Sequence, residues 1–180
     1  MSIPNLTKGV NVKEIEHKFI ISDFNKNDIW DREFIIFQWY MFNSQNKESK
    51  LKLIIDLHSF ERKYVRVTKE RLSNSESDKI VDYLDYNSIN FSNFIGKPFV
   101  CKRRSIKKDI HLDKFIFSKD VCKFLLEDEG DKNGLELFCK KNKIEIINDV
   151  TNNPKFRNIN MTIDFKELHL SSLKLILQLF

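Results

Sequence analysis

Charged and apolar residues alternate along several short segments of this chain, starting near its N-terminus. Between positions 14 and 19, Glu14, Glu16 and Lys18 alternate with three other residues, of which Ile15 and Phe19 are apolar. Successive side chains of a β-strand point to opposite faces of the sheet, so this spacing places the three charged groups on one face. The segment therefore predicts a strand with one charged face and one largely apolar face.

Similar patterns further along predict a meander of antiparallel strands, joined by polar turns rich in Asn, Asp and Ser. The expected strands are Lys13–Ile21, Phe34–Phe42, Lys50–Leu57, Lys63–Arg71, Ser75–Tyr86, Phe99–Lys107, His111–Phe117, Lys123–Glu129 and Ile144–Thr151. Helices are expected at Asn87–Ile95, before Gly96 and Pro98, and at Asp131–Lys143. We expect one domain over residues 1–180, with a lead-in tail at 1–12 and a C-terminal helix at about 160–180.

The composition is that of a basic globular protein, with a formal net charge of +5 over 180 residues. This surplus permits an anionic ligand without identifying one. Cys101, Cys122 and Cys139 are widely spaced, which indicates free thiols rather than a disulfide framework or a zinc site. Neither a secretory signal nor an apolar run of the roughly 20 residues needed to span a membrane is visible. We therefore expect a cytoplasmic protein with no membrane partner.

Charged groups at i, i+2 spacing recur through the chain, and acidic and basic groups fall largely on separate strands. They are Glu14/Glu16/Lys18, Lys50/Lys52, Lys69/Arg71, Glu76/Asp78, Lys102/Arg104 and Glu127/Glu129. If the sheet closes with these faces inward, its carboxylates would bind divalent cations and its basic groups would bind phosphate oxygens. The alternative is that each group lies on an exposed, hydrated sheet face.

The order of these motifs resembles the CYTH superfamily, the triphosphate tunnel metalloenzymes, in its bacterial triphosphatase-like branch. Residues 14–19 (EIEHKF) are similar to the family's E-x-E-x-K-F signature, and residues 37–41 (FQWYM) are similar to its QGYL strand. The later motifs of the family resemble, in chain order, Lys50/Lys52, Lys69, Glu76/Asp78, Lys102/Arg104, Asp113/Phe115, Glu127/Glu129 and the segments 149–151 and 156–158. The resemblance extends from Glu14 to about Asn158, nearly the whole chain.

This resemblance implies an α+β fold, a closed antiparallel eight-stranded β-barrel whose tunnel has flanking helices. It implies Mg²⁺ or Mn²⁺ as cofactor, with metal ligands at Glu14, Glu16, Glu127 and Glu129, supported by Glu76 and Asp78. Phosphates would be bound by Lys18, Lys50, Lys52, Lys69, Lys102 and Arg104. Arg66 stays a candidate beside Lys69, because the sequence does not determine which face of the Lys63–Arg71 strand turns inward. The expected catalytic residues are Glu16, Lys18, Glu76 and Arg104.

The expected activity is metal-dependent hydrolysis of a triphosphate, inorganic tripolyphosphate or an organic triphosphate, with release of orthophosphate. Lys50 and Lys52 stand where the family has arginines, which keeps the charge but loses the bidentate guanidinium. Asp78 is shorter than the family's Glu, which weakens it as a metal ligand. These departures keep two alternatives open: a class IV-type adenylate cyclase, and a tunnel that binds a nucleotide or polyphosphate without turnover. A nucleic-acid partner is not favoured, and a homodimer is left open.

Overall fold

The structure is a computed structural model that describes residues 10–22, 29–44, 46–73, 76–94, 96–119, 123–128 and 132–164. This part of the chain is mostly β-strand, with one α-helix and four short 3₁₀ helices. The strands are β1 (Val10–Ile15), β2 (His17–Ile21), β3 (Arg32–Asn43), β4 (Lys47–Asp56), β5 (Arg62–Arg71), β6 (Glu76–Leu84), β7 (Pro98–Lys107), β8 (Ile110–Phe117), β9 (Phe124–Asp128), β10 (Ile146–Asp149) and β11 (Ile163–Asp164). The helices are α1 (Lys132–Asn142), η1 (Tyr86–Ser88), η2 (Phe91–Phe94), η3 (Pro154–Phe156) and η4 (Asn158–Met161).

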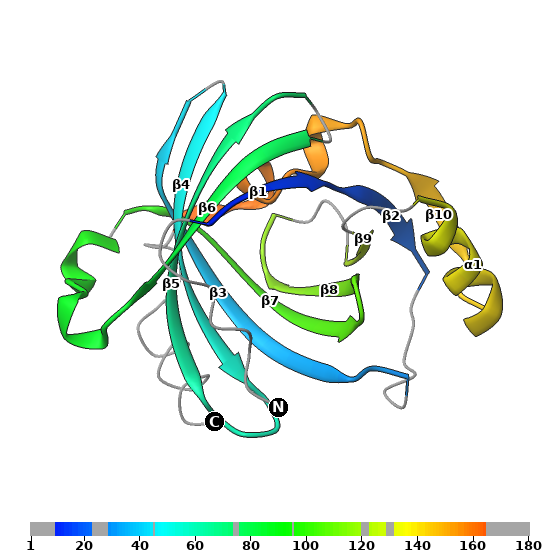
Figure 1. The fold of residues 1–180 in the computed structure, drawn as a ribbon, viewed down its shortest axis with the longest axis horizontal. Coiled ribbons are helices and arrows are strands. Elements are labelled where there is room, and N and C mark those ends of the chain that lie inside the picture. Colours follow the sequence, from blue (N-terminus) through cyan, green and yellow to red (C-terminus); the bar gives the residue numbers. More distant parts are fainter. Residues whose placement is uncertain are drawn as a thin grey trace.

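The strands form one strongly curved antiparallel sheet (Figure 1), in the order β1-β6-β5-β4-β3-β7-β8-β9-β2-β10, with β11 added to β7. Within the described ranges β1 pairs only with β6 and β10 only with β2, so no ladder joins the two ends of the sheet. The expected closed eight-stranded barrel with flanking helices is therefore wrong. Alternation within a strand determines which face is charged, whereas closure depends on strand number, tilt and stagger across the whole sheet.

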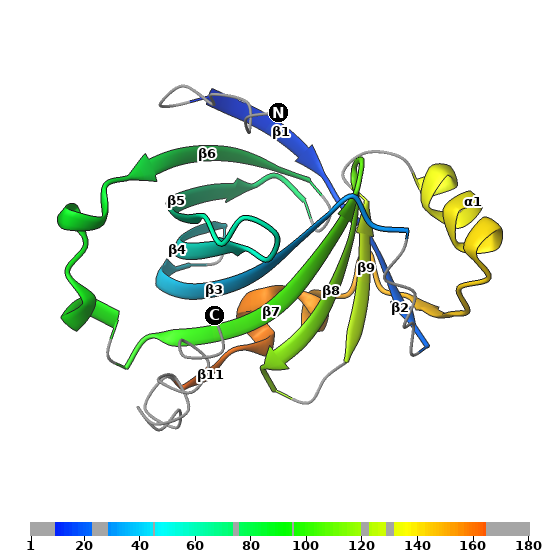
Figure 2. The same ribbon diagram turned by 90° about the horizontal axis from the view of Figure 1, so that it is seen from below.

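The N-terminal charged strand is divided in two at Glu16, which lies between β1 and β2. The two pieces join different neighbours, because β1 pairs with β6 whereas β2 pairs with β9. Glu16 thus connects β1, at one end of the strand order, to β2, next to the other end; both strands are labelled in Figure 2. Strand β1 also begins at Val10, so residues 10–12 are strand and not the expected tail.

In the middle of β3, β4 and β7 the convex face is apolar. Phe37 and Trp39 of β3 pack with Leu51 and Leu53 of β4 in a buried cluster. Phe94 of η2 covers this cluster and stacks on Trp39, with ring centroids 5.0 Å apart. Because side chains alternate along β4, the lysines between these leucines point to the concave face. The single helix expected at residues 87–95 is replaced by two short 3₁₀ helices, η1 and η2, and Ile95 lies outside the described residues.

Helix α1 confirms the helix expected at Asp131–Lys143 and packs beside β2 and β9 (Figures 1 and 2). Its buried residues Leu135 and Cys139 contact Phe19 of β2 and Leu126 of β9 in a second apolar cluster. Burying such side chains stabilises a fold by about 1.5–3 kcal/mol each. The helix therefore covers the face of β2 and β9 that is opposite to Lys18 and Glu127.

The 3₁₀ helices η3 and η4 cover part of the charged face. Phe156 and Met161 pack with Leu125 of β9 and with Val150. Leu125 is two residues from Glu127, so the cluster and Glu127 share one face of β9. The segment 158–164 forms η4 and β11, and the remainder of the expected C-terminal helix lies outside the described residues.

Two further expectations concern cysteines and membrane spans. Cys101 and Cys139 are buried free thiols, as expected, whereas Cys122 lies outside the described residues. Burial raises the pKa of the Cys101 thiol, which makes it unreactive. In the described part of the chain, every helix is too short or too polar to cross a membrane.

Candidate functional site

A charged cavity lies on the concave face of the sheet. Its lining comes from seven strands, from Glu16 between β1 and β2, and from the start of η4. The lining residues are Glu16, Lys18, Tyr40, Glu48, Lys50, Lys52, Lys69, Arg71, Lys79, Lys102, Arg104, Glu127, Arg157 and Asn158. Nine of these described side chains are Lys or Arg and three are carboxylates. The cavity measures about 40 Å³, which is room for a few water molecules. Its side chains therefore fill most of the space themselves, by pairing with one another.

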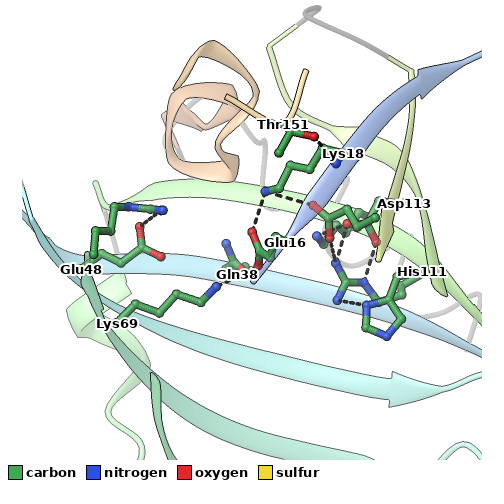
Figure 3. A network of polar contacts seen from close by, with 12 residues as sticks. Glu16, Lys18, Gln38, Glu48, Lys69, His111, Asp113 and Thr151 are labelled. Atoms are coloured by element: carbon green, nitrogen blue, oxygen red, sulfur yellow. Dashed lines mark hydrogen bonds and ion pairs between the residues drawn. The ribbon is translucent and has the colours of Figure 1, made fainter. Parts of the chain in front are cut away.

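Lys18 joins two carboxylates at the centre of this network (Figure 3). Its Nζ lies 2.8 Å from Glu16 Oε2 and 3.3 Å from Glu127 Oε1, and Glu127 is its direct neighbour across β2 and β9. Lys69 reaches the other oxygen of Glu16 at 2.9 Å. Burial raises the pKa of Glu16, but the charges of Lys18 and Lys69 outweigh it and hold that pKa well below its usual value. Glu16 is therefore ionised at neutral pH.

Arg104 is held by Asp113 on the neighbouring strand β8. The guanidinium donates from Nε to Oδ1 and from Nη2 to Oδ2, both at 2.6 Å, and Nη2 also donates to Glu127 at 2.7 Å. Asp113 also binds the ammonium of Lys102. Burial raises the pKa of Asp113, but Arg104 and Lys102 outweigh it and lower the pKa. The guanidinium also contacts His111. Burial and the charge of Arg104 lower the pKa of His111 to about 4.

Glu48 forms a separate pair of contacts on the other side of the network (Figure 3). Its carboxylate lies 2.9 Å from Lys50 Nζ and 3.0 Å from Arg71 Nη2. Burial raises the pKa of Glu48, yet Lys50 and Arg71 outweigh it and lower the pKa to about 2. Burial and Glu48 raise the pKa of the nearby Tyr40, so its phenol stays neutral. Arg157 and Asn158 also line the cavity.

Lys52 has no hydrogen bond or ion pair with any described residue, although it lines the same cavity. The residues directly opposite Lys52 on the neighbouring strands, Gln38 on β3 and Val65 on β5, carry no charge. Burial lowers the pKa of Lys52 well below its usual value, and the charges of Lys50 and Lys79 lower it further. Among the described residues, this amine therefore lies near cations without a compensating carboxylate.

The backbone of Lys18 is fixed from the segment that follows β10. Its N–H donates to Thr151 Oγ1 at 3.0 Å, and its carbonyl accepts a hydrogen bond from the Val150 N–H at 2.9 Å. The side chain of Thr151 thus contacts the strand that carries Lys18 (Figure 3). Thr151 therefore holds the backbone of β2 and does not line the cavity.

The structure brings most of the sequence-predicted residues together. Glu16, Lys18, Lys50, Lys52, Lys69, Lys102, Arg104 and Glu127 all line the cavity. Arg66 is exposed and lies opposite Leu51, on the other face of β5 from Lys69, so it does not reach the cavity. On β6, Lys79 lines the cavity and the adjacent Asp78 does not. The side chains of Glu14 and Glu76 and the whole of Glu129 lie outside the described residues.

Sequence reasoning missed four charged residues of the site. Glu48 lies in a segment expected to be a turn, although β4 begins at Lys47 and gives Glu48 the same alternation as Lys50. Asp113 was matched to a family motif without a role, and Lys79 and Arg157 were not considered for the site. The i, i+2 spacing of Glu48, Lys50 and Lys52 was a signal that could have identified Glu48.

Two carboxylates of the cavity have the chemistry of a metal ligand. Glu16 and Glu127 share Lys18, and the buried Glu127 Oε1 accepts no hydrogen bond, although Lys18 Nζ lies 3.3 Å away. Carboxylate oxygens suit Mg²⁺, which protein sites often bind through one or two carboxylates together with phosphate oxygens of the substrate. Within the described ranges no group of three or more His, Cys, Asp or Glu could hold a metal. The two residues fit a metal only when a ligand completes its coordination.

Comparisons with known proteins give no family for this chain. No known family profile matches it, and no curated protein matches it. Among solved structures, it is similar to the PH1819 protein from Pyrococcus horikoshii OT3, with 12% sequence identity and a TM-score of 0.44. That similarity covers 72% of this chain and 88% of the other, and it carries no functional argument.

Proposed function

We propose that the cavity binds a triphosphate chain and, with Mg²⁺ or Mn²⁺, hydrolyses it to release orthophosphate. The observation that carries this proposal is the surplus of nine Lys and Arg side chains over three carboxylates among the described lining residues. Like charges crowded in a partly buried site repel one another, and a polyanion removes that repulsion. A triphosphate supplies several negative charges along a chain narrow enough to lie between the strands.

The positions of the cations support a chain-like anion rather than a single small one. Glu48, which binds Lys50 and Arg71, lies on one side of the network. Asp113, which binds Arg104, lies on the other side, with Glu16 and Lys18 between them (Figure 3). A linear anion can contact all of these groups at once, whereas one orthophosphate cannot. The ligand would replace contacts that the cations now make with carboxylates of the protein.

Glu16 and Glu127 are the residues that would hold the metal. Both are ionised at neutral pH, since neighbouring cations lower their pKa values against the effect of burial. The metal would neutralise charge on the phosphate oxygens. Lys18, which now lies between the two carboxylates, would be released to contact phosphate.

Arg104 is the group best placed to stabilise charge that develops during phosphoryl transfer. Its bidentate contact with the buried Asp113 fixes the guanidinium before any ligand arrives. Donors held in place in advance stabilise a transition state more than mobile ones, because they need no reorganisation. Asp113 acts here as a positioning residue.

A second candidate, binding without turnover, is favoured by one observation. In the described part of the chain each carboxylate that lines the cavity already contacts a Lys or an Arg, and no larger metal-ligating group is present. A nucleotide or polyphosphate could then bind to the cations alone. A cytoplasmic location and a homodimer remain predictions that accompany either function.

The test is to incubate the protein with tripolyphosphate or ATP, with Mg²⁺, Mn²⁺ or EDTA, and to resolve the products. Metal-dependent orthophosphate supports hydrolysis, and unchanged ligand that binds in calorimetry supports the second candidate. Cyclic AMP with pyrophosphate would instead identify a cyclase. Glu127→Gln should reduce orthophosphate release by about 100-fold, whereas the exposed Glu70→Gln should not change it. The absence of both binding and turnover would overturn the proposal.

A further inference from the structure

Lys52 differs from the other lysines whose contacts in the cavity are described above. Lys18, Lys50, Lys69 and Lys102 each contact a carboxylate. Lys52 has no such contact with any described residue. Since an ammonium ion without a counter-charge is costly in a partly buried site, this amine is the one most readily left unprotonated.

Among the described residues, the strongest influences on Lys52 all favour the neutral amine. Lys50 on the same strand, Lys79 on β6, and Lys102 and Arg104 on β7 face it with positive charge. The register partners Gln38 and Val65 offer no carboxylate. Burial and these cations lower the pKa of Lys52 well below its usual value. A desolvated lysine beside other cations is a nucleophile near neutral pH.

We propose that Lys52 forms an imine with the carbonyl group of a phosphate-bearing aldehyde that enters the cavity. The ligand class follows from two features of one site: an amine with no counter-ion among the described residues, and surrounding cations that attract a phosphate group. The inference rests on the anion binding of the proposed function and adds a covalent activity to it. It concerns aldehydes, which triphosphate hydrolysis does not involve.

The reaction needs no oxidant or further reactant. The Lys52 nitrogen bonds to the carbonyl carbon and gives a carbinolamine. The carbonyl oxygen then leaves as water, with both hydrogens of the amine, and a C=N bond remains. The phosphate group stays with the surrounding cations and keeps the aldehyde beside the amine, which raises its effective concentration.

The test uses pyridoxal 5′-phosphate as the probe and pyridoxal as its phosphate-free counterpart. The full chain is incubated with each probe at pH 8 and reduced with borohydride, and the modified lysines are located by peptide mass spectrometry. We expect about one label per chain, at Lys52, with at least tenfold less label from pyridoxal. Lys52→Arg should remove this label, and Lys63→Arg, outside the cavity, should leave it unchanged.

Each result separates this inference from the proposed function. Tripolyphosphate should protect Lys52 from labelling, and failure to protect would overturn anion binding at this site. If pyridoxal 5′-phosphate competes with tripolyphosphate in calorimetry but Lys52 is not labelled, the cavity binds anions and the imine proposal is wrong. Labels spread over exposed lysines, or equal labelling by the two probes, would also overturn it. Circular dichroism of Lys52→Arg establishes that the loss of label is not a loss of folding.

Discussion

Arg104 and Asp113 face each other directly across β7 and β8 and form a bidentate contact, with both hydrogen bonds 2.6 Å long. Asp113 is completely buried, so its carboxylate depends on Arg104 and Lys102 for compensation of its charge. In this orientation Arg104 also reaches Glu127 at 2.7 Å. The pair therefore connects the folding of β7 and β8 to the electrostatics of the cavity.

Asp113→Asn should destabilise the protein by about 3–5 kcal/mol, because it leaves Arg104 and Lys102 as buried charges without their partner. Urea unfolding monitored by circular dichroism measures the change. Asp109→Asn is the control, since Asp109 is exposed in the turn between the same strands. A loss below about 0.5 kcal/mol for Asp113→Asn would show that the pair does not stabilise the fold.

Glu48 should make the protein less stable in acid. Its pKa falls from about 4.5 to about 2 on folding, so its contribution is present above the unfolded pKa. That contribution is lost as the pH falls from about 4.5 through 2. We expect Glu48→Gln to lower the free energy of unfolding at pH 7 and to flatten its decline below pH 5. An unchanged pH profile in urea titrations would contradict this assignment, and Glu70→Gln serves as the exposed control.

The crowded lysines should make stability rise at alkaline pH. Burial lowers the pKa of Lys50 to about 8, against the opposing effect of Glu48. A lysine whose folded pKa is depressed costs stability below that pKa, and the cost disappears as the pH rises toward the unfolded value of about 10.4. The free energy of unfolding should therefore increase between pH 8 and 10.

Lys52→Met tests the same repulsion at the residue with no described partner. The variant should be more stable than the wild type at pH 7 by about 1–3 kcal/mol, because an amine with no counter-ion among the described residues costs free energy on burial, either as an ammonium or through loss of its proton. Its affinity for tripolyphosphate should fall in calorimetry. The exposed Lys155→Met is the control for the loss of one positive charge. Destabilisation by Lys52→Met would mean that its ammonium is compensated.

Helix α1 offers a matched test of packing. Leu135 is fully buried against β2 and β9, whereas Leu137 on the same helix is 66% exposed. Leu135→Ala should cost about 2–5 kcal/mol through lost burial and a residual cavity. Leu137→Ala should stay within about 0.5 kcal/mol of the wild type. Equal losses in chemical unfolding would show that the helix packs in another orientation.

The alternation of residue types determined much of the site before any tertiary structure was considered. Lys50 and Lys52 alternate with leucines, so any strand at this place has one cationic and one apolar face. The same reasoning placed Lys102 with Arg104 on one face of β7. These are local properties, because the two-residue period of a strand does not depend on its neighbours. Helix α1 was likewise predictable from the spacing of Leu135, Phe138 and Cys139.

Only the tertiary structure decided which strands meet and whether the sheet closes. The sequence left Arg66 and Lys69 as alternatives, and the pairing of Val67 with Lys50 and of Lys69 with Glu48 turns Lys69 inward. The contact of Arg104 with Asp113 depends on the register of β7 with β8, which neither strand encodes alone. Closure was mispredicted for the same reason, since strand tilt and stagger are properties of the assembled sheet. Local pattern determined the charge of each face, and long-range pairing determined its partners.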